Sequence, residues 1–167
     1  MARALELARR GLYSTRPNPA VGCVIAQGVD VVGEGWHKQA GGPHAEVFAL
    51  QMAGNLAKGA TAYVTLEPCS HTGKTAPCAD ALIAAGVGRV VAAVQDANPQ
   101  VAGTGLAALR EAGIEVACGL LATEATDINV GFFKRMQTGT PRVFSKIASS
   151  LDGRSAMASG ESKWITG

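Results

Sequence analysis

The feature that most constrains how this chain can fold is a set of possible metal ligands between residues 43 and 78. A histidine stands in Pro43-His44-Ala45-Glu46-Val47, and two cysteines follow it, Cys69 and Cys78. One imidazole and two thiolates give a zinc ion three protein ligands and leave its fourth tetrahedral position open, which is typical of a catalytic site. The fold must therefore bring three segments that lie apart in the sequence to one point.

Glu46 follows His44 too closely to be a relaxed fourth ligand, but it is well placed to touch a water molecule at the open position and to move protons. His-x-Glu followed by Pro-Cys and a second cysteine is the signature of zinc-dependent nucleobase deaminases. The spacing departs from that signature, because eight residues separate Cys69 from Cys78 instead of two.

The eight-residue insertion, Ser70-His71-Thr72-Gly73-Lys74-Thr75-Ala76-Pro77, is bounded at both ends by the predicted ligands. An ordinary solvated loop is one interpretation of such a composition. However, its side chains must lie at the mouth of the site. His71, Lys74 and hydroxyl groups around a glycine suit an anionic group such as a phosphate.

Two polar residues outside the insertion are further candidates. His37 ends an expected strand shortly before the ligand histidine, and we favour a contact between His37 and a substrate. Asn18 stands between two prolines in Arg16-Pro17-Asn18-Pro19. It is either a turn residue or a rigid hydrogen-bonding group aimed at a base, and the spacing leaves both interpretations open.

A structural zinc is the alternative to a catalytic one. It needs a fourth protein ligand, for which His71 or His37 is available, but it leaves Glu46 unexplained. Cys23 and Cys118 lie in apolar stretches, so we expect both to pack in the core rather than to bind metal.

Composition narrows the class of protein. A chain of 167 residues with a net charge of +2 has the length of one ordinary domain, and it offers no general surface for nucleic acid. No apolar run reaches the roughly 18 residues of a membrane span, and the N-terminus lacks the apolar segment of a signal peptide. Four cysteines, two of them at metal spacing, indicate a cytoplasmic zinc enzyme rather than a disulfide framework.

Hydrophobic periodicity predicts alternating helices and strands, which favours an α/β sheet with helices on both faces. The expected helices are residues 1–10, 45–53, 77–85, 106–112 and 122–136, and the expected strands are residues 21–26, 29–36, 60–66, 89–94 and 114–118. His44, Glu46 and Cys78 fall at the starts of two helices, where the helix dipole favours anionic groups.

The alternation of predicted helices and strands ends near Thr138-Gly139-Thr140-Pro141. Residues 142–148 have the pattern of a new strand, but the remaining tail is too short to close a domain. We therefore expect one domain over residues 1–139, and a linker with the truncated start of a second domain over residues 140–167.

Four stretches resemble the family of bifunctional riboflavin biosynthesis proteins known as RibD, in which an N-terminal deaminase is fused to a C-terminal reductase. The resemblance covers essentially the whole chain, and the insertion between the cysteines is specific to this family within the deaminase superfamily. The stretches are Pro17-Asn18-Pro19-Ala20-Val21-Gly22, Pro43-His44-Ala45-Glu46-Val47, Thr65-Leu66-Glu67-Pro68-Cys69-Ser70-His71-Thr72-Gly73-Lys74-Thr75 and Gln95-Asp96-Ala97-Asn98-Pro99.

The resemblance implies a cytidine-deaminase-like fold of three α/β/α layers with a mixed central sheet. It implies deamination of 2,5-diamino-6-ribosylamino-4(3H)-pyrimidinone 5′-phosphate at ring position 2. The implied roles are zinc ligands for His44, Cys69 and Cys78, proton shuttle for Glu46, and substrate contacts for Asn18, His37, His71 and Lys74.

The tail resembles the opening of the family's NADPH-dependent reductase. Ala148 and Trp164 match cofactor positions there, and Ser162 matches a substrate position. Nearly all of that domain is absent, so we expect these residues to deaminate but not to reduce, with NADPH bound only by a complete reductase.

Two other functions compete with this one. A short Cys-x-x-Cys spacing and a basic RNA-binding face would favour a deaminase of cytosine, guanine or tRNA adenosine, and neither feature is present. A non-catalytic zinc-binding interaction module is the alternative from another class. For the deaminase we expect a small nucleotide as partner, no nucleic acid, no membrane, a homo-oligomeric assembly and a cytoplasmic location.

We predict that Lys74→Ala weakens binding of the phosphorylated substrate about ten- to more than a hundredfold, because a charge-assisted hydrogen bond contributes roughly 1.5–3 kcal/mol. The measurement compares the nucleotide with its dephosphorylated nucleoside. An equal penalty on both would show that Lys74 does not contact the phosphate.

Overall fold

The centre of the molecule is a five-stranded sheet with the strand order β2-β1-β3-β4-β5. The computed structural model describes residues 1–70, 77–99 and 101–161. β1 is antiparallel to β2 and β3, whereas β4 is parallel to β3 and β5, so the expected mixed sheet is confirmed. The strands are β1 (Gly22–Gln27), β2 (Asp30–Trp36), β3 (Thr61–Val64), β4 (Arg89–Ala92) and β5 (Glu115–Cys118).

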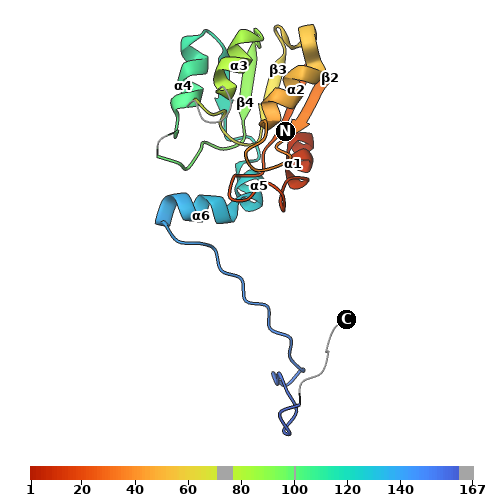
Figure 1. Cartoon of the computed structure of the whole chain (residues 1–167). Coiled ribbons are helices and arrows are strands. Elements are labelled where there is room, and N and C mark those ends of the chain that lie inside the picture. Colours follow the sequence, from red (N-terminus) through yellow and green to blue (C-terminus); the bar gives the residue numbers. More distant parts are fainter. Residues whose placement is uncertain (71–76, 100, 162–167) are drawn as a thin grey trace.

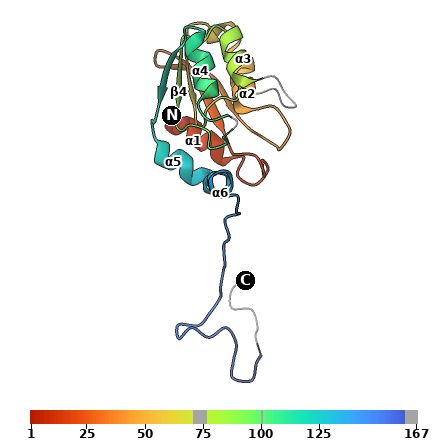
Figure 2. The ribbon, with the colours of Figure 1, turned by 90° about the vertical axis from the view of Figure 1, so that its left-hand side faces the viewer.

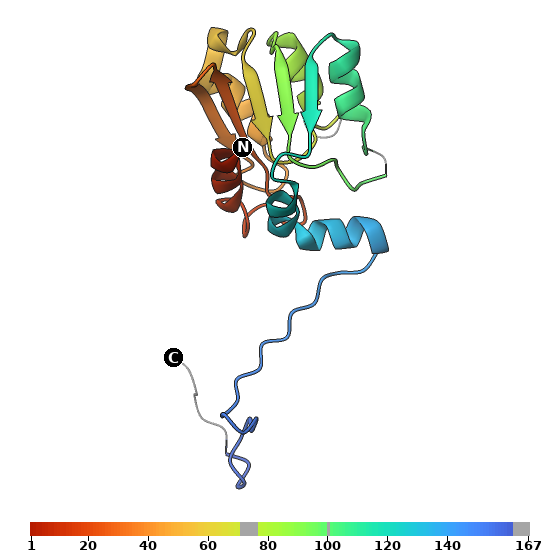
Figure 3. The ribbon, with the colours of Figure 1, turned by 180° about the vertical axis from the view of Figure 1, so that it is seen from behind.

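Helices lie on both faces of the sheet, as the alternating pattern predicts. α2, α3 and α4 lie side by side on one face (Figure 1), while α1 and α5 lie together at one end of the opposite face (Figure 3). The helices are α1 (Ala2–Arg9), α2 (Ala45–Ala53), α3 (Cys78–Ala84), α4 (Thr104–Glu111), α5 (Ala122–Ile128) and α6 (Val130–Thr138), with a short 3-10 helix η1 (Gly54–Ala57) after α2.

Glycines in β2 allow α2 to lie unusually close to the sheet. A Cβ atom on Gly33 would lie 2.2 Å from the carbonyl oxygen of Ala49, and one on Gly35 would lie 2.2 Å from that of Ala45. On the facing side of α2, Ala45, Ala49 and Ala53 are buried, so small side chains meet a strand surface that lacks side chains. This contact determines where the first turn of α2, with its polar residues, comes to lie.

The main core fills the space between the sheet and helices α2 to α4. Its largest fully buried side chains include Ile25, Val64, Leu82, Val90 and Leu109. Val90, Val91 and Ala92 of β4 are all buried, which agrees with the prediction that this apolar strand is covered on both faces.

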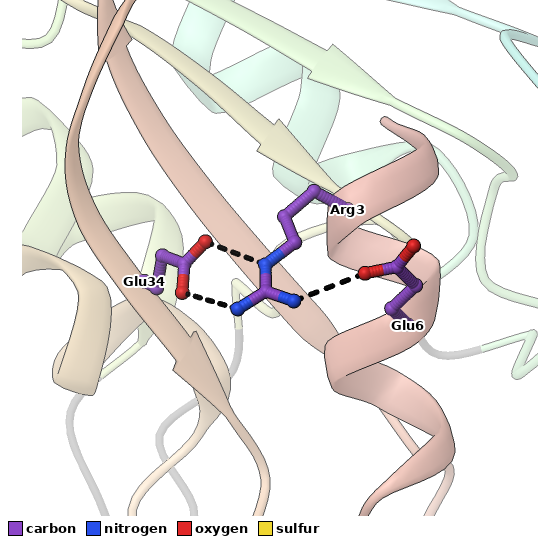
Figure 4. Close-up of polar contacts among 3 residues, drawn as sticks. All are labelled: Arg3, Glu6 and Glu34. Carbon is purple, nitrogen blue, oxygen red and sulfur yellow. Dashed lines mark hydrogen bonds and ion pairs between the residues drawn. The ribbon is translucent and has the colours of Figure 1, made fainter.

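Arg3 links the opposite face to the edge strand (Figure 4). Its guanidinium donates to both carboxylate oxygens of Glu34 on β2, at 2.7 and 2.9 Å, and to Glu6 on its own helix at 3.0 Å. These groups are partly exposed, so each pair stabilises the fold only weakly.

The prediction of a single helix over residues 122–136 is wrong, because the chain forms two helices, α5 and α6, with Asn129 between them. The buried Asn129 side chain accepts from the Ala20 amide and donates to the Ala20 carbonyl, both at 2.8 Å. This pair of hydrogen bonds fixes the junction on the loop before β1, and α6 leaves it in a new direction (Figure 3).

Two other expectations are corrected. Cys118 ends the edge strand β5 and is exposed, whereas Cys23 is buried as expected. The strand expected at residues 142–148 is absent from the described residues, where the tail has no neighbouring strand with which to pair.

The tail runs away from the sheet and its helices (Figures 1 and 2). Between residues 140 and 161 it forms no helix or strand, and Ala148 is exposed there. Val143, Phe144 and Ile147 are also exposed. Ser162 and Trp164 lie outside the described residues. No helix in the described ranges is both long and apolar enough to cross a membrane.

We predict that Gly35→Ala destabilises the protein by about 1–3 kcal/mol, because the new methyl group must displace the backbone of α2. Urea denaturation measures the change. Gly131→Ala on α6 is the control, since its methyl group would meet only Arg142 Cβ at 3.9 Å. That control is expected to be neutral or stabilising by up to about 1 kcal/mol. Equal stabilities of the two variants would contradict the close-approach argument.

Candidate active site and metal centre

Three separate elements bring the predicted zinc ligands together at one edge of the sheet. His44 is the residue before the first turn of α2, and Cys78 is the first residue of α3. Cys69 lies in the turn that follows β3. The three residues come from segments 25 and 34 positions apart, so only the tertiary fold makes this cluster.

The ligand atoms are spaced for one small cation. Nδ1 of His44 lies 3.2 Å from Sγ of Cys78 and 3.5 Å from Sγ of Cys69. The three atoms all lie within 4.8 Å of one another. Ligand atoms around a tetrahedral zinc are roughly 3.5–4 Å apart, given zinc–sulfur and zinc–nitrogen bonds of about 2.3 and 2.0–2.1 Å. A histidine and two cysteines in this arrangement therefore fit zinc.

Hydrogen bonds prepare the thiols for metal. The thiol of Cys78, helped by His44, lowers the pKa of Cys69 to about 4, while the same hydrogen bond raises the pKa of Cys78. The backbone amide of Cys78 also donates to Sγ of Cys69 at 3.3 Å. A metal cation binds cysteine as the thiolate, so its binding would release the proton that the pair retains.

Glu46 lies in the first turn of α2 and is 3% exposed. Burial raises the pKa of its carboxyl group. Its Oε2 atom has no hydrogen-bond partner among the described residues. A buried carboxyl oxygen without a partner is costly, so this atom is suited to a group that arrives with the ligand.

His37 is buried beside the same cluster, with its ring centroid 5.3 Å from that of His44. Its Nδ1 lies 3.0 Å from the carbonyl oxygen of Pro43, which can only accept, so Nδ1 carries the proton. Burial lowers the pKa of His37, which keeps the ring neutral. Nε2 is consequently an acceptor, and no described residue bonds to it.

These residues line a pocket of about 360 Å³. Of the residues predicted from the sequence, the fold places Asn18, His37, His44, Glu46 and Cys69 in its wall. Cys78, the first residue of α3, is buried and does not line the pocket. Ala148 is not in the wall, and His71 and Lys74 lie outside the described residues.

Sequence reasoning missed other parts of the wall. Asp96, Asn98 and Val101 follow β4, and Phe132, Arg135 and Met136 come from α6. Asp96 and Asn98 belong to a stretch that carries the family resemblance. The resemblance marks this stretch as functional, but it assigns neither residue a role. The α6 residues give no local signal, because their place depends on the turn at Asn129.

Comparison with known proteins agrees with this fold and site. Residues 1–94 match the family described as the cytidine and deoxycytidylate deaminase zinc-binding region. The crystal structure called Acinetobacter baumannii RibD, form 1, superposes with a TM-score of 0.96 at 62% identity, covering 99% of this chain and 47% of that one. The fold and the ligand set therefore define a zinc-binding deaminase of the cytidine deaminase class.

Curated relatives narrow the class. The riboflavin biosynthesis protein RibD of Escherichia coli is 66% identical over 99% of this chain and 45% of its own length. A diaminohydroxyphosphoribosylamino-pyrimidine deaminase of Buchnera aphidicola subsp. Schizaphis graminum is 55% identical over 84% of this chain and 96% of its own length. The chain belongs to the RibD family, and it spans less than half the length of the RibD proteins that it matches.

We predict that Cys69→Ala lowers the zinc content of the purified protein from about one ion per chain to near zero, because two ligands hold zinc poorly. Cys118→Ala is the matched control, since this thiol is exposed at the end of β5. Elemental analysis measures both. Full zinc content in Cys69→Ala would show that the metal lies elsewhere.

Proposed function

We propose that this chain catalyses the zinc-dependent hydrolytic deamination of 2,5-diamino-6-ribosylamino-4(3H)-pyrimidinone 5′-phosphate in riboflavin biosynthesis. The products are 5-amino-6-ribosylaminouracil 5′-phosphate and ammonia. One observation carries the proposal: a buried carboxyl group, Glu46, shares a pocket with His44 and Cys69 in a chain that is similar to a named pyrimidine deaminase over almost all of that protein.

His44, Cys69 and Cys78 would hold the zinc ion. When bound, zinc lowers the pKa of a coordinated water and supplies a nucleophile at neutral pH. The three protein ligands leave one position for that water, and the two thiolates and neutral imidazole are the donor set that zinc prefers.

Glu46 moves the protons. Its Oε2 atom, which has no partner within the described part of the chain, accepts a proton from the attacking water and passes it to the neighbouring ring nitrogen. A second transfer takes the proton of the newly added hydroxyl group to the exocyclic amine. The carbon–nitrogen bond then breaks, ammonia leaves, and a ring carbonyl remains. Burial raises the pKa of Glu46 and so makes it able to hold the proton between these transfers.

His37 and Asn18 orient the substrate. Nε2 of His37 is an acceptor, so it selects an N–H or O–H group of the substrate. The Asn18 amide can donate and accept, which suits the edge of a base. A carbonyl group without a donor would not be bound by His37 in this tautomer.

The phosphate is proposed to bind His71 and Lys74 of the insertion. Arg135 of α6 lines the pocket and adds a positive charge there. A guanidinium pairs well with phosphate oxygens, so Arg135 can also attract an anionic substrate.

The division of the chain follows from the same proposal. Residues 1–139 form the deaminase domain and residues 140–167 form a linker with the truncated start of the reductase, to which Ala148, Ser162 and Trp164 belong. NADPH binds only where that domain is complete. We place the enzyme in the cytoplasm, in keeping with cysteines that form no disulfide, and expect no nucleic-acid partner, in keeping with its net charge of +2. A homo-oligomeric assembly without membrane partners is part of the same proposal.

Ammonia release from the diaminopyrimidinone nucleotide tests the proposed substrate directly. The zinc-loaded chain is assayed in parallel with cytidine and guanine, because the alternative is deamination of another base. Turnover of the nucleotide alone supports the proposal. A preference for cytidine or guanine would contradict the proposed substrate and support deamination of another base. Zinc bound without any ammonia release would indicate a zinc-binding interaction module.

We predict that Glu46→Gln keeps its zinc but loses at least about 10²–10⁴-fold in turnover, because an amide cannot shuttle protons. Zinc content and ammonia release are measured on the same sample. Glu34→Gln, at the exposed ion pair with Arg3, is the control and is expected to keep full activity. An active Glu46→Gln variant would contradict the mechanism.

A further inference from the structure

We propose that Glu67 is a positioning residue that sets the place of the zinc ligand Cys69 and of one pocket wall together. Glu67 stands two residues before Cys69, in the turn after β3, and is 3% exposed. Its carboxylate does not pair with a cation among the described residues. It is instead surrounded by backbone amides.

The two carboxylate oxygens accept hydrogen bonds from four backbone N–H groups. Oε1 accepts from Gly105 at 2.9 Å and from Leu106 at 3.3 Å, both in the first turn of α4. Oε2 accepts from Asp96 at 3.1 Å and from Gly103 at 2.9 Å. The amides of Gly103, Gly105 and Leu106 lie at the start of α4, where backbone N–H groups have no partner within the helix and the positive end of the helix favours a carboxylate.

The α4 helix depends on this distant side chain. Its own N-cap residue is Gly103, which has no side chain to cap the helix. Gly105 brings α4 into contact with the ligand turn, because a Cβ atom there would lie 1.9 Å from the carbonyl oxygen of Pro68. On the other side of Cys69, the hydroxyl of Ser70 lies 2.6 Å from that of Thr104. Cys69 is thus flanked on both sides by residues held to α4.

The same carboxylate also fixes the pocket. Asp96 and Gly103, which donate to Oε2, lie at the two ends of the segment that supplies Asp96, Asn98 and Val101 to the pocket wall. A simple helix cap would affect only the stability of the fold. A residue that positions ligand and wall should affect zinc retention and substrate affinity as well.

The test uses the zinc-loaded chain with Glu67→Gln, whose NH₂ group cannot accept two of the four hydrogen bonds. We expect zinc release to a colorimetric chelator to become about tenfold faster or more, the range typical of partners that orient metal ligands. Release is measured at a temperature where the variant is folded. Glu34→Gln is the control, because it weakens the exposed pair with Arg3 (Figure 4), and Glu34 neither lines the pocket nor belongs to the ligand group.

A second readout rests on the proposed function. The KM of Glu67→Gln for the diaminopyrimidinone nucleotide is expected to rise about tenfold, with a smaller change in kcat. Glu67 lines the pocket, but its carboxylate is bound by four backbone amides and takes no part in the proton transfers proposed for Glu46. If zinc release and KM are unchanged and only the melting temperature falls, Glu67 acts as a helix cap and the positioning role is wrong. If the unmodified chain does not turn over the nucleotide, the proposed function fails, yet zinc release still decides the role of Glu67.

Glu67→Asp covers the case in which the glutamine variant does not fold. It keeps the negative charge at the start of α4, but the shorter side chain cannot reach both pairs of amides. We expect faster zinc release than in the unmodified protein. Equal release would show that charge alone suffices and would overturn the positioning role.

Discussion

The whole site depends on the close contact between α2 and the glycine-containing surface of β2. His44 immediately precedes α2 and Glu46 lies in its first turn, so the place of this one helix determines the distance between the proposed metal ligand and the proposed proton shuttle. With Gly33 and Gly35 in β2, the backbone of α2 touches the backbone of the strand. A contact between backbones has little freedom to relax, so it fixes the position of the helix more tightly than long side chains would.

The sheet topology then collects the other groups at the same edge. β3 and β4 are parallel, and the segments that follow them carry Cys69 on one side and Asp96 and Asn98 on the other. β1 runs in the opposite direction to β3, so the loop before it, with Asn18, reaches the same edge. Ligand sites at the carboxyl ends of parallel strands are the general rule for such sheets. Glu67 joins two of these segments through four backbone amides.

Local patterns predict much of this structure. The apolar spacing of residues 45–53 predicts α2 with its observed bounds, and the near-continuous apolar run at residues 89–94 predicts β4. The ligand set is recognisable because residue types and spacing carry its chemistry. The break at Asn129 was missed because it depends on hydrogen bonds to Ala20, which is far away in sequence. The α6 part of the pocket and the partners of Glu67 were missed for the same reason. The apolar run at residues 142–148 predicts a strand, but a strand forms only where another strand can pair with it.

The central claim is a zinc ion with three protein ligands and one position left for water. X-ray absorption at the zinc edge of the zinc-loaded chain tests it most directly. The account predicts two sulfur atoms at about 2.3 Å, together with one imidazole nitrogen and one oxygen at about 2.0–2.1 Å. Two imidazoles, with His37 or His71 as the fourth ligand, would close the site and contradict a catalytic zinc. One sulfur atom instead of two would contradict the pairing of Cys69 with Cys78.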